Sequence, residues 1–239
     1  MLFDPAVDTV KKGPWMMFFM VAFFGMFGPP GVSYYWYGYA AVLILFFVLA
    51  VFLVAVCERY LVFVASIFFS VVGALVFFMS SLLYLLVSNI FGLGTFESIV
   101  LGLLPLILVV AAIGLVFLGK DSVNDFQRID NRVALPTKQQ KYYSSGFVAG
   151  LITLSGGGLL NLIGQINGGF VGVLVGTSGC VALIIYFRKS IRGLCVLRNQ
   201  ERQMLTPYTF MRIDEIREAR NQWWVARSLK WLTSLHSSV

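Results

Sequence analysis

The amino-acid sequence predicts an all-α, polytopic membrane protein with about six transmembrane helices. Of its 239 residues, 59% are hydrophobic and only 12% are charged, whereas soluble domains carry about 25% charged residues. The hydrophobic residues fall in long runs, the mean hydropathy is +0.84, and the basic residues lie in alternate loops between the runs. A soluble fold cannot bury so much apolar surface, so the first partner that the composition implies is the lipid bilayer.

Six apolar segments are long enough to cross a hydrocarbon core about 30 Å thick, which takes about 20 helical residues. Only helices and closed barrels satisfy the backbone in lipid, and these runs lack the alternating pattern of barrel strands. We therefore expect a transmembrane domain over residues 1–187, with helices at residues 15–31, 39–57, 61–88, 99–119, 147–163 and 168–187. The third segment is longer than a bilayer needs, and Pro105 is expected to kink the fourth.

The distribution of basic residues predicts the orientation. If the amino terminus is inside, Lys11 and Lys12, Arg59, five residues between the fourth and fifth segments, and ten after the sixth all lie on one face. The other loops contain no Lys or Arg, and their only charge is Glu97. Because Lys and Arg are retained on the cytoplasmic side during insertion, we expect both termini in the cytoplasm of a bacterial inner membrane or plasma membrane.

The outer turn after the first segment is rich in aromatic residues. Pro29 and Pro30 end the apolar run, and Tyr34, Tyr35 and Tyr39 follow them. This pattern favours an aromatic belt at the membrane interface, with an aromatic ligand cage as the alternative.

The last two segments form a glycine-rich hairpin. Gly164, Gly168, Gly172 and Gly176 recur at every fourth residue, which makes a groove without side chains on one face of a helix. The pattern resembles a glycine zipper, a packing motif of membrane channels and secretion-system components. It predicts close helix packing, either within the chain or between copies in a homo-oligomer. Ser155 and the three glycines after it interrupt the fifth segment, so the hairpin either crosses twice or is re-entrant.

Charged residues are absent from the spans between their ends, which argues against ion-coupled transport. A channel remains allowed, because hydroxyls, amides and carbonyls can line a pore. The polar candidates for pore lining or for interhelical hydrogen bonds are Ser66, Ser70, Ser155, Asn161, Gln165 and Asn167.

Two polar regions lie on the basic face. Residues 120–130 favour a helical extension of the fourth span, followed by a turn. In the basic tail, residues 188–239, Thr206 and Pro207 predict the start of a helix that runs toward Ser234. We expect this tail to dock on anionic lipid headgroups or on a partner membrane protein, and we favour both over nucleic acid. The docking residues would be Arg217, Arg220, Trp223, Trp224, Arg227 and Trp231.

The sequence shows no nucleophile beside a base, no paired carboxylates and no metal-ligand spacing among Cys57, Cys180 and Cys195. We therefore expect no enzyme activity, no catalytic or metal-ligating residues and no cofactor. The functional hypothesis is a non-enzymatic membrane protein that self-associates through the glycine-rich hairpin, as a channel or as the membrane part of a translocation or secretion complex. The alternative is a membrane-embedded regulatory or protective binder of the immunity or entry-exclusion type.

Overall fold

A computed structural model describes residues 6–29, 32–92, 94–119, 126–129, 131–134, 165–204 and 206–223. The described chain is mostly helical, and four of its helices are long and apolar enough to cross a membrane: Tyr35–Ala55, Tyr60–Phe91, Thr95–Leu118 and Gly168–Tyr186. They correspond to the second, third, fourth and sixth predicted spans. The fifth, residues 147–163, lies outside the described residues.

The first helix, α1 (Val7–Gly25), begins earlier than predicted and carries charges in its first turns. Lys12 lies 4.0 Å from Asp8, one helical turn away. These charges set α1 apart from the four apolar helices, although it packs along α2 and α3 with Val10 and Met17 fully buried.

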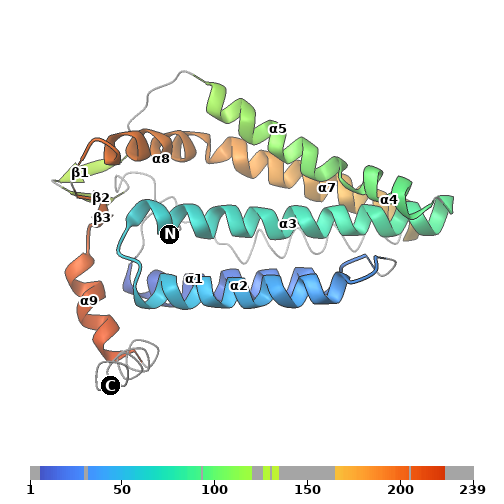
Figure 1. The fold of residues 1–239 in the computed structure, drawn as a ribbon. Coiled ribbons are helices and arrows are strands. Elements are labelled where there is room, and N and C mark those ends of the chain that lie inside the picture. Colours follow the sequence, from blue (N-terminus) through green and yellow to red (C-terminus); the bar gives the residue numbers. More distant parts are fainter. Residues whose placement is uncertain are drawn as a thin grey trace.

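The longest helix, α3 (Tyr60–Phe91), is the centre of the bundle (Figure 1). Its 32 residues measure about 48 Å, well beyond a hydrocarbon core. It ends where Gly92 adopts a left-handed conformation with φ of 59°. α3 packs against α1 and against all the helices that follow it through α8, whereas α2 (Tyr35–Ala55) packs mainly on α1 and has few contacts with α3.

The fourth span is broken into α4 (Thr95–Gly102) and α5 (Leu104–Leu118), which agrees with the expected kink. The interruption falls at Leu103, two residues before Pro105, whose nitrogen has no hydrogen to donate. At the break, a Cβ on Gly102 would lie 3.2 Å from the Ser80 carbonyl oxygen, so α4 crosses α3 at close range.

The sixth span is α7 (Gln165–Tyr186), and α8 (Arg188–Glu201) continues almost from its end. α7 packs against α3 and α5. α8 is amphipathic, with Ile191, Leu194 and Leu197 buried and Arg188 exposed. The sequence analysis did not predict this helix, although the threefold spacing of its apolar residues indicates one.

Two predictions for the polar regions are wrong. Residues 127–129 and 132–134 form strands β1 (Gln127–Ile129) and β2 (Arg132–Ala134), not a helical extension of the fourth span, and residues 120–125 of that prediction lie outside the described residues. No helix starts at Thr206, because β3 (Thr209–Phe210) pairs with β2 in parallel and α9 (Ile213–Gln222) begins only after it.

Long-range hydrogen bonds explain the second difference. The Thr209 amide donates to the Asn131 carbonyl at 2.9 Å, and the Tyr60 amide donates to the Tyr208 carbonyl at 3.0 Å. Phe210 is buried among aromatic rings, with its ring centroid 5.4 Å from that of Phe63. A backbone donor of Thr209 and a backbone acceptor of Tyr208, which a helix would use locally, are therefore satisfied by other elements.

We call the layer made by α8, β1, β2, β3 and α9 the basic cap. It covers one end of the helical bundle (Figure 1). Apart from Ile184 of α7, the largest fully buried side chains belong to the cap and to α1, α2 and α3: Val10, Met17, Leu53, Val54, Tyr60, Phe63, Val64, Val133, Leu197, Phe210 and Ile216. The opposite end, around Tyr35 and Glu97, carries no such layer in the described part of the chain.

Candidate functional site

An opening lies between α2 and α3, which have few contacts with each other. It is an almost wholly apolar cavity of about 880 Å³, open along one side, and we call it the lateral groove. From Ala65 to Phe77, the α3 wall is about 18 Å long, more than half of a hydrocarbon core of about 30 Å. The helical residues that line it are Val21 and Gly25 of α1, Tyr35, Gly38, Tyr39, Val42, Phe46 and Leu49 of α2, and Ala65, Ser66, Phe69, Ser70, Gly73, Ala74 and Phe77 of α3.

Five of the seven α3 residues that line the lateral groove are small, and the other two are Phe69 and Phe77. Ser66, Ser70 and Ala74 follow one another at every fourth residue, and Gly73 lies beside them. Among the described residues, no atom lies within 4 Å of a Cβ built on Gly73 or on Gly38 across the groove. The structure therefore places two of the polar residues singled out from the sequence, Ser66 and Ser70, in one cavity wall with open space in front of it.

Aromatic residues close the end of the groove that is remote from the basic cap. The hydroxyls of Tyr35 and Tyr39 donate to the carbonyls of Gly25 and Ala22 in the last turns of α1, the latter at 2.6 Å. The two rings are stacked, with centroids 6.1 Å apart. These tyrosines satisfy carbonyls that the end of a helix leaves free, so they brace α1 against α2 and hold the groove in shape.

The predicted glycine row does not share one environment. Gly168 is buried on α7, and a Cβ on Gly176 would overlap the Met79 side chain of α3. Gly172 is exposed, with no described atom within 4 Å of a Cβ. Gly164 lies outside the described residues.

Two other glycines of α7, Gly169 and Gly179, are not part of the i,i+4 pattern. Each lies on the same helix face as one glycine of that pattern. A Cβ on Gly169 would lie 2.7 Å from a methyl group of Leu86, so Gly169 and Gly176 face α3 one heptad apart. Gly179, one heptad after Gly172, has no described atom within 4 Å of its Cβ position. With respect to the described residues, α7 therefore has one packed glycine face, Gly169 and Gly176, and one open glycine face, Gly172 and Gly179.

The other polar candidates contribute less. Gln165 and Asn167 lie in the first turn of α7. Ser155 and Asn161 lie outside the described residues, so the structure joins none of these four to the lateral groove.

In the basic cap, Arg220 reaches back to the end of α2. Its side chain is only 6% exposed, and one guanidinium nitrogen donates to the carbonyls of Cys57 at 2.6 Å and of Leu53 at 3.4 Å. Burial lowers the pKa of Arg220, which remains high enough for the group to stay charged. Trp223, at the end of α9, is 8% exposed. Both residues thus face the chain's own helices.

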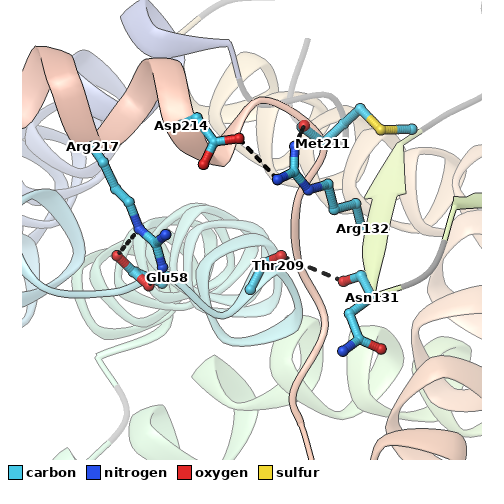
Figure 2. A network of polar contacts seen from close by, with 7 residues as sticks. All are labelled: Glu58, Asn131, Arg132, Thr209, Met211, Asp214 and Arg217. Carbon is cyan, nitrogen blue, oxygen red and sulfur yellow. Dashed lines mark hydrogen bonds and ion pairs between the residues drawn. The ribbon is translucent and has the colours of Figure 1, made fainter.

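Two ion pairs hold the surface of the same layer (Figure 2). Arg217 of α9 makes a bidentate contact with Glu58, at 2.7 and 2.9 Å, and Arg132 of β2 lies 2.8 Å from Asp214. The hydrogen bond from Arg217 holds the pKa of Glu58 below its usual value. Both pairs are exposed to solvent, so they orient α9 more than they stabilise it.

A second arginine of the cap binds a helix end. Arg192 of α8 donates from Nε to the Val116 carbonyl in the last turn of α5, at 2.7 Å. Neither α2 nor α5 has a basic residue in its own last turn, where a positive charge is favourable. The sequence analysis missed this role of the tail arginines. The sequence pattern that indicates this role is a set of apolar helices without basic residues in their last turns, followed by a tail rich in arginine.

Of the six predicted docking residues, Arg217, Arg220 and Trp223 contact the body of the protein, and Trp224, Arg227 and Trp231 lie outside the described residues. Comparisons with protein-family models, with curated proteins and with solved structures find no match to this chain. The lateral groove and the basic cap are therefore the features on which a functional assignment rests.

Proposed function

We propose that this chain is a non-enzymatic membrane protein that acts by binding a transmembrane helix of another membrane protein in its lateral groove. The single observation that carries the proposal is the open, apolar groove between α2 and α3, with small residues along its α3 wall. This proposal corresponds to the alternative hypothesis from the sequence, a membrane-embedded regulatory or protective binder.

The wall of the groove favours a helix as the occupant. Helices associate in lipid by close packing and by interhelical hydrogen bonds, because lipid tails are as apolar as the side chains. Small residues at every fourth position let two backbones approach closely, and this is the arrangement of Ser66, Ser70 and Ala74. The two hydroxyls also provide donors that could reach a partner's carbonyl or hydroxyl groups.

Site-specific photocrosslinking in native membranes tests this function. A photoreactive phenylalanine analogue at Phe69, in the groove, should form a protein adduct of one defined size, whereas the same group at exposed Leu45, outside the groove, should label lipid. The Gly73→Leu variant should abolish the Phe69 adduct because leucine fills the groove. Gly114→Leu on α5 is the matched control, since its Cβ also meets no described atom within 4 Å and it does not line the groove. Lipid adducts alone at Phe69 would refute the proposal.

The full topology is part of the same proposal: six crossings, with both termini in the cytoplasm. It is supported by the directions of the described helices. α1, α2, α3 and the α4–α5 segment alternate in direction, α7 runs parallel to α5 as one further crossing between them would require, and the basic ends of the helices lie together. The described Lys and Arg residues lie in the first turns of α1, in the α2–α3 turn and in the basic cap. Under the positive-inside rule, that end faces the cytoplasm.

A second candidate function is favoured by the open glycine face of α7. Gly172 and Gly179 leave backbone accessible on a membrane helix, and such surfaces promote association of helices in lipid. Copies that meet through this face would form a homo-oligomer that serves as a channel or as the membrane part of a translocation or secretion complex. Its test compares Gly172 with Gly176 and is described in the Discussion.

A further inference from the structure

Three arginines line a pocket where α3 meets the basic cap. Arg59 precedes the first residue of α3, Arg198 lies in the last turn of α8, and Arg202 follows that helix. Together with Val62, Glu201 and Pro207 they line a cavity of about 360 Å³. Three guanidinium groups and one carboxylate give the pocket a surplus of positive charge.

These three guanidinium groups differ from several other arginines of the cap. Arg132, Arg217 and Arg220 each bind a carboxylate or a backbone carbonyl of the chain. In contrast, no hydrogen bond or ion pair joins the side chains of Arg59, Arg198 or Arg202 to any described residue, and Glu201 is in no ion pair with them. Within the described part of the chain, their donors are therefore available to a ligand.

An apolar pocket adjoins the basic one. A cavity of about 530 Å³ shares Arg59, Val62 and Pro207 with it and extends along Phe52 and Val56, in and just after the last turn of α2. Phe52 and Val56 are 44% and 56% exposed, respectively. The basic pocket thus lies at the boundary between the polar layer and the apolar surface of the membrane helices.

We propose that this pair of pockets binds one anionic phospholipid from the leaflet on the side of the basic cap. The phosphate lies between Arg59, Arg198 and Arg202, because the planar guanidinium group matches the oxygens of a phosphate. An acyl chain follows the apolar pocket along Phe52 and Val56. The apolar continuation selects a lipid over a free phosphate, and basic pockets between membrane helices on the cytoplasmic side are suited to anionic headgroups.

Native mass spectrometry of the full-length protein in detergent tests the site. With added dioleoylphosphatidylglycerol, the wild-type protein should retain one lipid molecule, and with dioleoylphosphatidylcholine it should retain none at the same concentration. The Arg198→Gln, Arg202→Gln variant should bind phosphatidylglycerol about 25-fold more weakly, since each basic residue near an anionic surface contributes about a factor of five. Both residues are exposed, so the variant should fold normally.

The matched control removes the same charge from the other end of α8. Arg188 and Lys189 are exposed and line neither pocket, so Arg188→Gln, Lys189→Gln should bind phosphatidylglycerol like the wild type. Equal losses in the two double variants, or undiminished binding by Arg198→Gln, Arg202→Gln, would overturn the proposal.

A competition experiment separates the two sources of phosphate. Inorganic phosphate or glycerol 3-phosphate at millimolar concentration should leave the bound lipid in place, because neither compound fills the apolar pocket. Displacement of phosphatidylglycerol by either compound would assign the arginines to a soluble phosphate and overturn the lipid site. The crosslink from Phe69 does not depend on these arginines, so failure here is distinguishable from failure of the proposed helix binding.

Discussion

Arg220 and Cys57 are 163 positions apart in the chain, yet the Arg220 guanidinium donates to the Cys57 carbonyl at 2.6 Å. The bond joins the final described helix to the end of α2. It also buries a positive charge at the C-terminal end of a helix, where exposed carbonyls and the helix dipole favour it. Part of the basic tail is therefore a structural element of the membrane domain.

The first prediction is that loss of this bond detaches α9. Arg220→Ala leaves the Cys57 and Leu53 carbonyls without their donor, and a buried unsatisfied group costs about 2 kcal/mol, or about a 30-fold change in the docking equilibrium. Cys57 lies beneath this contact and is 4% exposed. In a Cys195→Ser background, we expect maleimide to label Cys57 about 30-fold faster in the variant than in the parent protein.

Two controls make this measurement specific. Arg220→Lys retains the charge and should show an intermediate labelling rate. Arg212→Ala removes an exposed arginine of the same segment that pairs only locally with Glu215 among the described residues, at 3.9 Å, and should leave the rate unchanged. Slow labelling in Arg220→Ala would contradict the anchoring role.

The second prediction concerns the pH dependence of stability. The hydrogen bond from Arg217 holds the pKa of Glu58 below the usual value of a glutamate. The pair therefore adds stability above the pKa of Glu58 in the unfolded chain and loses it as the pH falls through the lower, folded pKa. Glu58→Gln should lower the thermal midpoint at pH 7, and the difference from the wild type should shrink as the pH falls through the folded-state pKa of Glu58. A difference in thermal midpoint that grows toward low pH would contradict this prediction. The effect should be small because both side chains are partly exposed.

The third prediction tests the orientation. In sealed right-side-out vesicles, an impermeant maleimide should label a cysteine at Glu97 and at Gln165, and should label a cysteine at Arg132 or Arg212 only after the membrane is opened. The reason is that all 18 basic residues fall on one predicted face. Labelling of Arg212→Cys without permeabilisation would reverse the orientation, and labelling of Glu97→Cys only after permeabilisation would remove the six-span topology.

The sequence predicted the membrane helices well because the signal is local. A bilayer requires a continuous apolar run, so α2, α3, the α4–α5 segment and α7 can be located from composition alone. Pro105 likewise marks the break at Leu103, because the missing donor is a property of one residue. The basic cap depends on partners far apart in the chain. β3 forms because the Thr209 amide donates a hydrogen bond to the Asn131 carbonyl, and no pattern within the tail specifies that contact.

The candidate sites divide in the same way. Ser66 and Ser70 could be chosen from the sequence because they share one face of a long apolar helix, and both line the lateral groove. The groove itself exists because α2 packs on α1 and has few contacts with α3, which periodicity cannot reveal. Arg59 and Arg198 are separated by two membrane helices or more, so only the folded chain brings them to one pocket.

The fourth prediction compares two glycines of α7 that differ in their neighbours. Gly176→Leu places a branched side chain against Met79. Met79 can move aside for a methyl group, but a leucine overfills the α3–α7 contact, and overpacking costs about 1–3 kcal/mol. The purified monomer should therefore unfold at a lower temperature than the wild type.

Gly172→Leu is the matched variant, with the same substitution on the same helix four residues earlier. Both replacements gain about 1 kcal/mol of helix propensity, so the difference between them reports packing alone. Because no described atom lies within 4 Å of the Gly172 Cβ position, the Gly172→Leu monomer should be as stable as the wild type or more stable. If copies of the chain meet through the open face, Gly172→Leu should shift the detergent-solubilised protein to a smaller species, measured by light scattering. A wild-type protein that is already monomeric, or a Gly172→Leu monomer destabilised as much as Gly176→Leu, would refute self-association through this face.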